Sequence, residues 1–443
     1  MLTLFLNADL HAPRSLGRRH LLVAGRQVAW MGTEPLDLPA ALGARVVDLE
    51  GARVIPGLVD CHVHLTGGGG EAGAHTKVPP LALSRFTLGG VTTVVGLLGT
   101  DDATRHPREL VTAVHGLRHE GLSAWAWTAG YHVPPVTLTG TVRGDLAHVA
   151  CIVGVKTAIS DHRSSQPTRD ELLRLASEAH VGGLMTGKAG IVHLHVGDGP
   201  RGLEPIREAL AASELPPRVF NPTHVNRRRA LFEEAVALAG QGCHVDITAF
   251  PVEEGEDAWS AEDALLRYLD AGAPPERVSV SSDGGGCLPV FDAEGRVASM
   301  DVGAPGALAL TLRELLGRGC NLGDVLPAFT SNPARLLRLA GKGHIAVGAD
   351  ADLVVLDADG RIQDVMAMGG WMVRGGEAVK TGTFEAGSPK AGTFEPGSLG
   401  AGAREPGSSE AGAREPESSE AGSRGPGSAE PGSPEAGRSE VSR

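Results

Sequence analysis

Val54-Ile-Pro-Gly-Leu-Val-Asp-Cys-His62-Val-His64-Leu-Thr-Gly-Gly-Gly-Gly-Glu71 is the stretch that decides the fold: an apolar run leads into two histidines, and four glycines and a glutamate follow. In a β-strand, alternate side chains point to the same side, so His62 and His64 project together about 6–7 Å apart. Two imidazoles on one side of a strand suit a shared metal ion. Taken alone, the pair also fits two surface histidines near the end of a sheet. The other residues of the chain are needed to distinguish a metal site from this alternative.

Apolar and amphipathic runs alternate through residues 56–342. The apolar runs predicted as strands are 58–63, 91–97, 123–128, 151–158, 190–195, 218–223, 243–248 and 278–282. Amphipathic runs predicted as helices lie between them, at 107–119, 169–179, 203–213, 226–239 and 261–271. Eight β/α units over this length predict an α/β fold, a (β/α)8 TIM-type barrel. An open doubly wound sheet would carry a glycine-rich dinucleotide loop at the position that His62 and His64 occupy.

Short β-like runs at both ends of the chain, in residues 1–55 and 343–383, predict a small composite β-sandwich beside the barrel. The N-terminal runs read as antiparallel strands at 2–6, 21–24, 27–31 and 45–49, and the C-terminal ones lie at 352–356, 361–365, 370–374 and 377–381. Residues 384–443 continue a degenerating ten-residue repeat rich in Gly, Ala, Arg, Glu, Pro and Ser. Such units lack apolar residues to offset about 1–2 kcal/mol of ordering per residue, so we expect a disordered tail.

Composition narrows the class of protein. A formal net charge of −13 argues against nucleic acid as a partner, since phosphate binding wants a basic surface. No stretch approaches the roughly 18–20 apolar residues of a membrane span. The N-terminal residues lack the basic segment with which a signal peptide begins, so we predict a strand there and not a signal peptide. The five cysteines are odd in number and scattered, which is typical of reduced thiols, and we expect a cytoplasmic protein.

The predicted barrel strands end in side chains that can bind metals. Barrel enzymes carry their active sites at the carboxyl ends of the strands, so these side chains should converge. Strands one, four, five, six and eight supply them in turn: His62 and His64, Lys156, His193 and His195, His224, and Asp283. Together they predict a two-metal hydrolase.

This set, with its Gly-Gly-Gly-Gly-Glu71 extension, resembles the isoaspartyl dipeptidases of the amidohydrolase superfamily over roughly residues 1–385. The resemblance implies two divalent metal ions, with Zn²⁺ the best match to a histidine-rich set. It places His62, His64 and Asp283 around one ion, and His195 and His224 around the other. Because the resemblance falls on His195, we expect its neighbour His193 to be a core or supporting residue.

Lys156 is the unusual member, because a lysine inside an apolar strand is disfavoured. An ammonium beside two cations would be worse, at about 4 kcal/mol for each pair of unit charges 4 Å apart. The resemblance implies that carbon dioxide converts Lys156 to N6-carboxylysine, an anion that bridges the two metals together with a hydroxide. The alternative is a lysine whose ammonium extends out of the barrel to solvent.

The resemblance also implies the reaction, which is hydrolysis of the β-aspartyl isopeptide bond by the bridging hydroxide. Asp283 acts as general base and then general acid, and Tyr131 helps to stabilise the oxyanion. Further positions match substrate contacts: Glu71 for the α-ammonium, Thr100 beside it, and Arg163 and Arg227 for the carboxylate. Cys287 stands where the family usually has serine, and a thiol is the weaker hydrogen-bond donor.

Two other functions remain open at this stage. A cyclic-amide hydrolase of the dihydroorotase or hydantoinase type uses a similar metal set, but lacks the glycine extension and the Asp-His-Arg163 and His-Val-Asn-Arg227 loops. A non-catalytic relative that keeps the barrel for assembly would be expected to have lost ligands. The family resemblance further implies a homo-oligomer that acts on small dipeptides.

Overall fold

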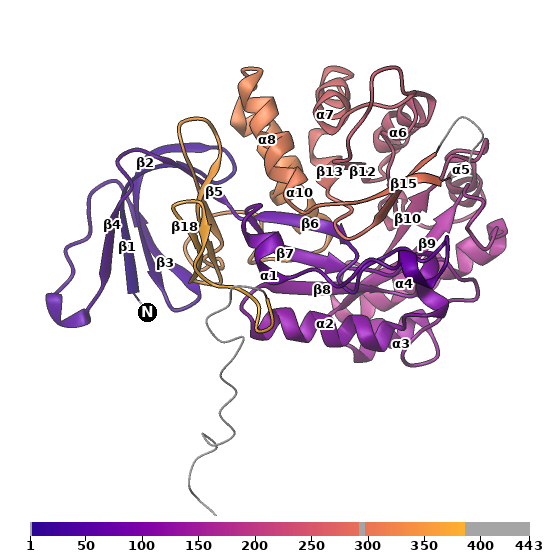
Figure 1. Cartoon of the computed structure of the whole chain (residues 1–443), viewed down its shortest axis with the longest axis horizontal. Coiled ribbons are helices and arrows are strands. Elements are labelled where there is room, and N and C mark those ends of the chain that lie inside the picture. The colour runs from indigo at the N-terminus through magenta and orange to yellow at the C-terminus, as the bar shows by residue number, and fades with distance from the viewer. Residues whose placement is uncertain (1, 292–296, 386–443) are drawn as a thin grey trace, which may run out of the picture. The chain divides into compact units, whose positions relative to one another are not determined.

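The computed structural model describes residues 2–291 and 297–385, which form a barrel and an adjoining sheet (Figure 1). The predicted fold class, a (β/α)8 barrel with a β-domain built from both chain ends, is confirmed. The predicted disordered tail lies, from residue 386 onward, outside the described residues. The boundaries drawn at residues 55 and 342 stay a prediction.

The barrel consists of eight parallel strands in chain order. They are β6 (Leu58–Val63), β7 (Val91–Gly96), β8 (Ser123–Thr128), β9 (Ile152–Ile159), β10 (Ile191–Val196), β11 (Phe220–Thr223), β12 (Val245–Thr248) and β13 (Val278–Ser281). Almost every strand residue is buried, as expected for a sheet that is covered on both faces. The first and last strands meet through a bridge between Val63 and Gly284, beside which the His64 N–H donates to the Gly284 carbonyl at 2.8 Å.

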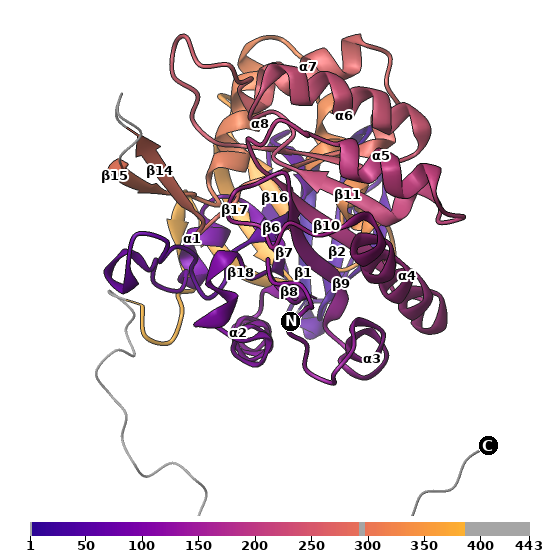
Figure 2. The same cartoon turned by 90° about the vertical axis from the view of Figure 1, so that its right-hand side faces the viewer.

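Helices surround these strands (Figure 2). They include α2 (Pro107–His119), α3 (Val142–His148), α4 (Arg169–Thr186), α5 (Glu204–Ala211), α6 (Arg229–Gln241), α7 (Ala261–Asp270) and α8 (Ala307–Gly317), with the short α1 (Leu83–Thr87), α9 (Leu322–Val325) and α10 (Ser331–Leu336). Helix α4 begins at a capping box formed by Thr168 and Glu171. It continues seven residues past its predicted end, because Gly183 packs against the backbone of Gly190, where a Cβ would come within 2.6 Å.

The two chain ends build one nine-stranded sheet, which lies at the left of Figure 1. Its strands are β1 (Leu2–His11), β2 (Ser15–Ala24), β3 (Gln27–Gly32), β4 (Arg45–Asp48), β5 (Arg53–Pro56), β16 (Leu353–Leu356), β17 (Ile362–Ala367), β18 (Gly370–Arg374) and β19 (Glu377–Ala378). The antiparallel pair β5 and β16 joins the two ends. The expectation of antiparallel N-terminal strands was partly wrong, since β4 and β5 both pair parallel to β1. After the β2–β3 hairpin, the connection between residues 32 and 45 carries the chain back to the starting end of β1.

A hairpin of β14 (Cys287–Phe291) and β15 (Val297–Val302) follows the last barrel strand and was not predicted. It extends the loop that carries Asp283 and Cys287. Among the helices of the described residues, none has the length and apolar character that a membrane crossing requires.

Candidate active site

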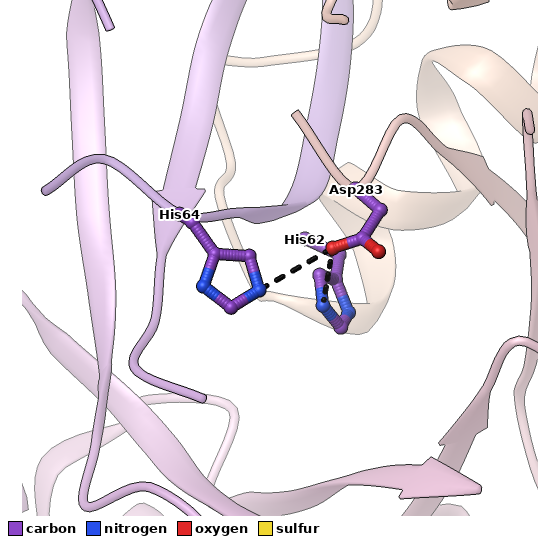
Figure 3. A group of neighbouring side chains, drawn as sticks. All are labelled: His62, His64 and Asp283. Atoms are coloured by element: carbon purple, nitrogen blue, oxygen red, sulfur yellow. Dashed lines mark ion pairs between the residues drawn. The ribbon is translucent and has the colours of Figure 1, made fainter. Parts of the chain in front are cut away.

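Three predicted ligands meet at the carboxyl ends of β6 and β13. The Nε2 atoms of His62 and His64 each lie 3.3 Å from the same carboxylate oxygen of Asp283 (Figure 3). One donor atom from each residue falls within 4.8 Å of the others, as metal ligation requires. Asp283 has a φ of 51°, in the left-handed region that residues with a Cβ rarely adopt. Such strained positions cluster at functional sites.

Lys156 points into the barrel and is only 1% exposed. It lies on β9 level with His193 on β10, and its Nζ has no hydrogen-bond partner within residues 2–291 and 297–385. Burial lowers the pKa of the Lys156 ammonium to about 7, although the carboxylates of Asp283 and Asp246 raise it. The outward orientation that the sequence left open is therefore excluded.

His193 contacts the predicted ligand His62. Its Nε2 lies 2.8 Å from Nδ1 of His62, and its own Nδ1 lies 2.6 Å from the side-chain oxygen of Asn221. The ring is stacked on Trp127, with centroids 4.8 Å apart and planes 8° from parallel. These contacts fix the ring of His62 so that its Nε2 is directed at Asp283. A supporting role was predicted for His193, whereas Asn221 and Trp127 were missed.

His195 and His224 complete the group of imidazoles. Their ring centroids lie 4.8 Å apart, and the His224 ring lies 4.7 Å from that of His62. Nδ1 of His224 contacts the Thr248 hydroxyl at 2.8 Å, so its Nε2 is free to bind elsewhere. Burial lowers the pKa of His62 and His224 well below the usual value and that of His195 to about 3. The imidazoles are therefore neutral at pH 7, the form that binds metals.

Glu71, Thr100 and Arg163 come together from three different βα loops. The Thr100 hydroxyl donates to Oε1 of Glu71 at 2.9 Å, and Nη1 of Arg163 lies 3.4 Å from the same oxygen. Arg163 is fixed by Asp161, which accepts from its Nε at 3.0 Å and from its Nη2 at 2.8 Å. The cluster therefore presents a carboxylate, a hydroxyl and a guanidinium side by side.

Asp161 was missed as a site residue, although the sequence placed it two positions before Arg163. Its side chain is 3% exposed, and Oδ2 also lies 2.7 Å from Nε2 of His195. Burial raises the pKa of the Asp161 carboxyl, but the bonds from His195 and Arg163 outweigh this and hold it far below its usual range. Asp161 thus connects a predicted metal ligand to a predicted substrate-binding arginine.

Arg227, Tyr131 and Cys287 lie at the edge of the same site. Nη1 of Arg227 donates to the Val196 carbonyl at 2.9 Å and lies 3.5 Å from Nε2 of His195. The Tyr131 ring lies 4.8 Å from the His195 ring, and burial raises the pKa of its hydroxyl well above the usual value. Burial, and next the charge of Glu71, raise the pKa of the Cys287 thiol. All the site residues predicted from sequence therefore gather at one end of the barrel, and their individual roles stay predictions.

The donor set fits divalent cations. Imidazole side chains lie around the Asp283 carboxylate. Burial raises the pKa of Asp283, but its contact with His64 and the nearby His224 and Lys156 outweigh burial and lower it. Oδ1 of Asp283, Nδ1 of His64 and Nζ of Lys156 are all buried without a hydrogen-bond partner among the described residues. Buried polar atoms are normally satisfied, so three unsatisfied atoms in one cluster indicate a ligand-binding role.

Comparison with known proteins supports a ligand-binding role for this cluster of side chains. A model of the amidohydrolase family matches residues 53–372. A solved β-aspartyl dipeptidase from Fervidobacterium islandicum AW-1, in complex with β-Asp-Leu, is 39% identical with a TM-score of 0.79, and the match covers 85% of this chain and 98% of that one. An imidazolonepropionase from Salinispora arenicola is 28% identical, over 76% of this chain and 85% of the relative. A dihydroorotase from Anaplasma phagocytophilum is 26% identical, over 80% of this chain and 86% of the relative. The resemblance predicted from the motifs is confirmed.

Proposed function

This chain belongs to the amidohydrolase family, and we propose that it hydrolyses the isopeptide bond of β-aspartyl dipeptides. The observation that carries the proposal is the meeting of Glu71, Thr100 and Arg163 beside the histidine cluster. A β-aspartyl dipeptide presents a free α-ammonium and an α-carboxylate next to the scissile side-chain amide. A carboxylate and a guanidinium a few ångströms apart match those two opposite charges.

The substrate's charged groups would divide the cluster between them. Glu71 and the Thr100 oxygen accept hydrogen bonds from the ammonium, while Arg163 and Arg227 donate to carboxylate oxygens. Asp161 holds the Arg163 guanidinium through two of its nitrogens, which leaves Nη1 to face Glu71. Because the two partners are fixed by different loops, the substrate is bound in one orientation, with its side-chain amide directed at the histidines.

The metals would be held by the residues described above. His62, His64 and Asp283 would bind one divalent ion, His195 and His224 the other, and Lys156 would bridge them as N6-carboxylysine, with Zn²⁺ as the best match. A neutral, unbonded amine is the form that reacts with carbon dioxide, which is supported by the burial of Lys156. When bound, the two cations would lower the pKa of the attacking water and polarise the scissile carbonyl.

Proton transfer falls to Asp283, whose carboxylate stays ionised at neutral pH. It accepts the proton of the attacking water and returns it to the nitrogen of the leaving amino acid. The Tyr131 hydroxyl stays protonated, because burial raises its pKa, and so can donate a hydrogen bond to the oxyanion. The products are aspartate and a free amino acid.

A cyclic-amide hydrolase is the second candidate, favoured by the dihydroorotase and imidazolonepropionase relatives. A cyclic ureide has no free α-ammonium, so it would leave Glu71 without a partner. A purified, zinc-loaded protein assayed with β-Asp-Leu, α-Asp-Leu and dihydroorotate separates the two functions. We expect the protein to hydrolyse β-Asp-Leu alone. If it cleaved dihydroorotate and left β-Asp-Leu intact, the second candidate would replace the proposal.

A further inference from the structure

We propose that the adjacent aspartates Asp101 and Asp102 are positioning residues that tie three βα loops of the active site together. Asp101 acts on the side of the site that binds the substrate ammonium, and Asp102 acts on Tyr131. The inference rests on the proposed function for its kinetic consequences, whereas the loop connections themselves do not depend on it.

Asp101 is held at both of its carboxylate oxygens. Oδ1 accepts from the Gly99 N–H at 3.2 Å, and Oδ2 accepts from Nε of Arg105 at 2.7 Å. The Asp101 and Arg105 side chains are only 3% and 8% exposed. A buried charge of this kind is retained only when it is paired and hydrogen-bonded. The bonds fix the 3-10 turn Thr100–Ala103, and therefore the Thr100 hydroxyl that donates to Glu71.

Arg105 extends this connection into the loop that carries Glu71. Its Nη2 donates to the Val78 carbonyl at 3.0 Å, while the Val78 N–H donates to the Gly68 carbonyl at 2.9 Å. The Val78 carbonyl packs so closely on Gly67 that a Cβ there would lie 1.9 Å from its oxygen. Asp101 therefore fixes, through Arg105, the backbone of the glycine run that leads to Glu71.

Asp102 contacts a different loop, the one that follows β8. Its Oδ2 accepts from the His132 N–H at 2.8 Å. The side chain also lies flat against Gly130, where an added Cβ would come within 2.6 Å of the same oxygen. Tyr131 lies between these two contacts, so Asp102 fixes the backbone on both sides of it.

The two carboxylates are adjacent in sequence but hold different parts of the site. Loss of the Asp101 contacts frees Glu71 and Thr100, which bind the substrate in both ground and transition states, so KM should rise while kcat stays the same. Loss of the Asp102 contacts frees Tyr131, which acts on the developing oxyanion, so kcat should fall. A general structural role for either aspartate would not separate the two parameters.

The test compares Asp101→Asn, Asp102→Ala and Asp102→Asn with the zinc-loaded wild type. For β-Asp-Leu we expect Asp101→Asn to raise KM about tenfold with kcat within about twofold, and Asp102→Ala to lower kcat about tenfold with KM within about twofold. Asp102→Asn keeps a carbonyl oxygen for the His132 N–H and should restore most of kcat. N-succinyl-leucine lacks the ammonium, so its inhibition constant should not change in Asp101→Asn.

Glu109→Gln is the matched control, because Glu109 is a half-exposed partner of the same arginine, 3.6 Å from its Nη1. It should leave both parameters unchanged. Hydrogen exchange measured by mass spectrometry reports the loops without any substrate. Exchange should rise in residues 67–78 for Asp101→Asn and in residues 129–135 for Asp102→Ala.

The outcomes separate the two proposals. Wild-type protein that leaves β-Asp-Leu intact contradicts the proposed function, and the exchange data then decide the loop connections alone. Unchanged exchange, or a rise shared by all three loops in every variant, overturns the positioning roles. If Asp101→Asn does not fold, Arg105→Met takes its place, since a methionine can donate to neither Asp101 nor the Val78 carbonyl.

Discussion

Two buried lysines in different regions of the molecule have opposite surroundings. Lys342, between the barrel and the sheet of the chain ends, is 5% exposed. Its Nζ donates to the Ser123 hydroxyl and to Oδ2 of Asp352 at 2.6 Å each, and it lies 2.9 Å from Oδ2 of Asp350. Lys156, inside the barrel, is 1% exposed, and no residue in the described part of the chain makes a hydrogen bond with it.

The difference fits a structural role for Lys342 and the proposed functional role for Lys156. An ion pair with satisfied hydrogen bonds compensates for the cost of burial, whereas an unpaired buried ammonium costs several kcal/mol. Such a residue has to be explained by something other than stability of the fold. The contacts of Lys342 are satisfied by the protein itself, whereas the surroundings of Lys156 fit the proposed binding of further groups.

Replacing Lys156 by methionine should have the largest effect on activity. Without the bridging carbamate, we expect kcat/KM for β-Asp-Leu to fall by on the order of 10⁴ or more, about 5.5 kcal/mol of transition-state stabilisation. The metal-free variant should unfold at the same or a higher temperature than wild type, because an unpaired amine is replaced by an apolar chain of similar length. Kinetic assays and thermal unfolding measure the two effects, and Lys380→Met on the exposed surface is the control. A variant that kept its activity would exclude the carbamate.

Replacing Lys342 by methionine should lower the stability of the protein and leave its activity unchanged. The change leaves the carboxylate of Asp352 buried without a cation and removes the partner of the partly exposed Asp350, so the free energy of unfolding should fall by about 3–5 kcal/mol. Activity per folded molecule should not change. Urea unfolding monitored alongside β-Asp-Leu hydrolysis measures both, and the double variant Lys342→Met/Asp352→Leu should recover part of the loss. If the single variant were as stable as wild type, the comparison of the two lysines would be wrong.

The barrel could be predicted because its signals are local. Strands β6 and β8 and helix α2 have the bounds expected from the apolar and amphipathic runs. The parallel pairing of β4 and β5 with β1 and the continuation of α4 could not be read in the same way. The strand pairing depends on residues distant in sequence, such as Thr3 and Arg45, and the continuation of α4 coincides with the packing of Gly183 against the backbone of Gly190.

The site could be predicted where a residue type is itself unusual, as a lysine in an apolar strand or a histidine pair before glycines. Residues that act by supporting others gave no such signal. Asp161 and the neighbouring His162 are equally polar in sequence, yet only Asp161 is buried, while the side chain of His162 is 87% exposed. Asp101 and Asp102 likewise read as ordinary loop residues, because Asp101 is connected to the next loop only through Arg105, and Asp102 binds a backbone N–H of another loop.

The pH dependence of stability sharpens the comparison further. Burial lowers the pKa of Lys156 from 10.5 to about 7, so between these values the unfolded chain binds one more proton than the folded one. For the protein without metal and carbon dioxide, this residue therefore increases the free energy of unfolding by up to about 1.4 kcal/mol per pH unit as the pH rises from 7 to 10. Below pH 7 it contributes no change with pH. The measurement is the difference in free energy of unfolding between wild type and Lys156→Met at each pH. If this difference stayed constant over the range, the pKa of Lys156 would not be lowered in the folded protein.

The smallest effect is expected at Cys287, which lies beside the glycine run and not in the metal cluster. A Cβ on Gly69 would lie 3.4 Å from the Cys287 Cβ, so a smaller serine hydroxyl fits the same space without moving the loop. Because a hydroxyl donates a stronger hydrogen bond than a thiol, Cys287→Ser should lower KM for β-Asp-Leu by less than about fivefold, about 1 kcal/mol or less. Because burial raises the pKa of the Cys287 thiol, iodoacetamide should inactivate the wild type slowly and faster as the pH rises; Cys287→Ser should resist this inactivation, while Cys320→Ser, away from the site, should remain as sensitive as wild type. Equal inactivation of the wild type and Cys287→Ser would mean that the reactive thiol lies elsewhere.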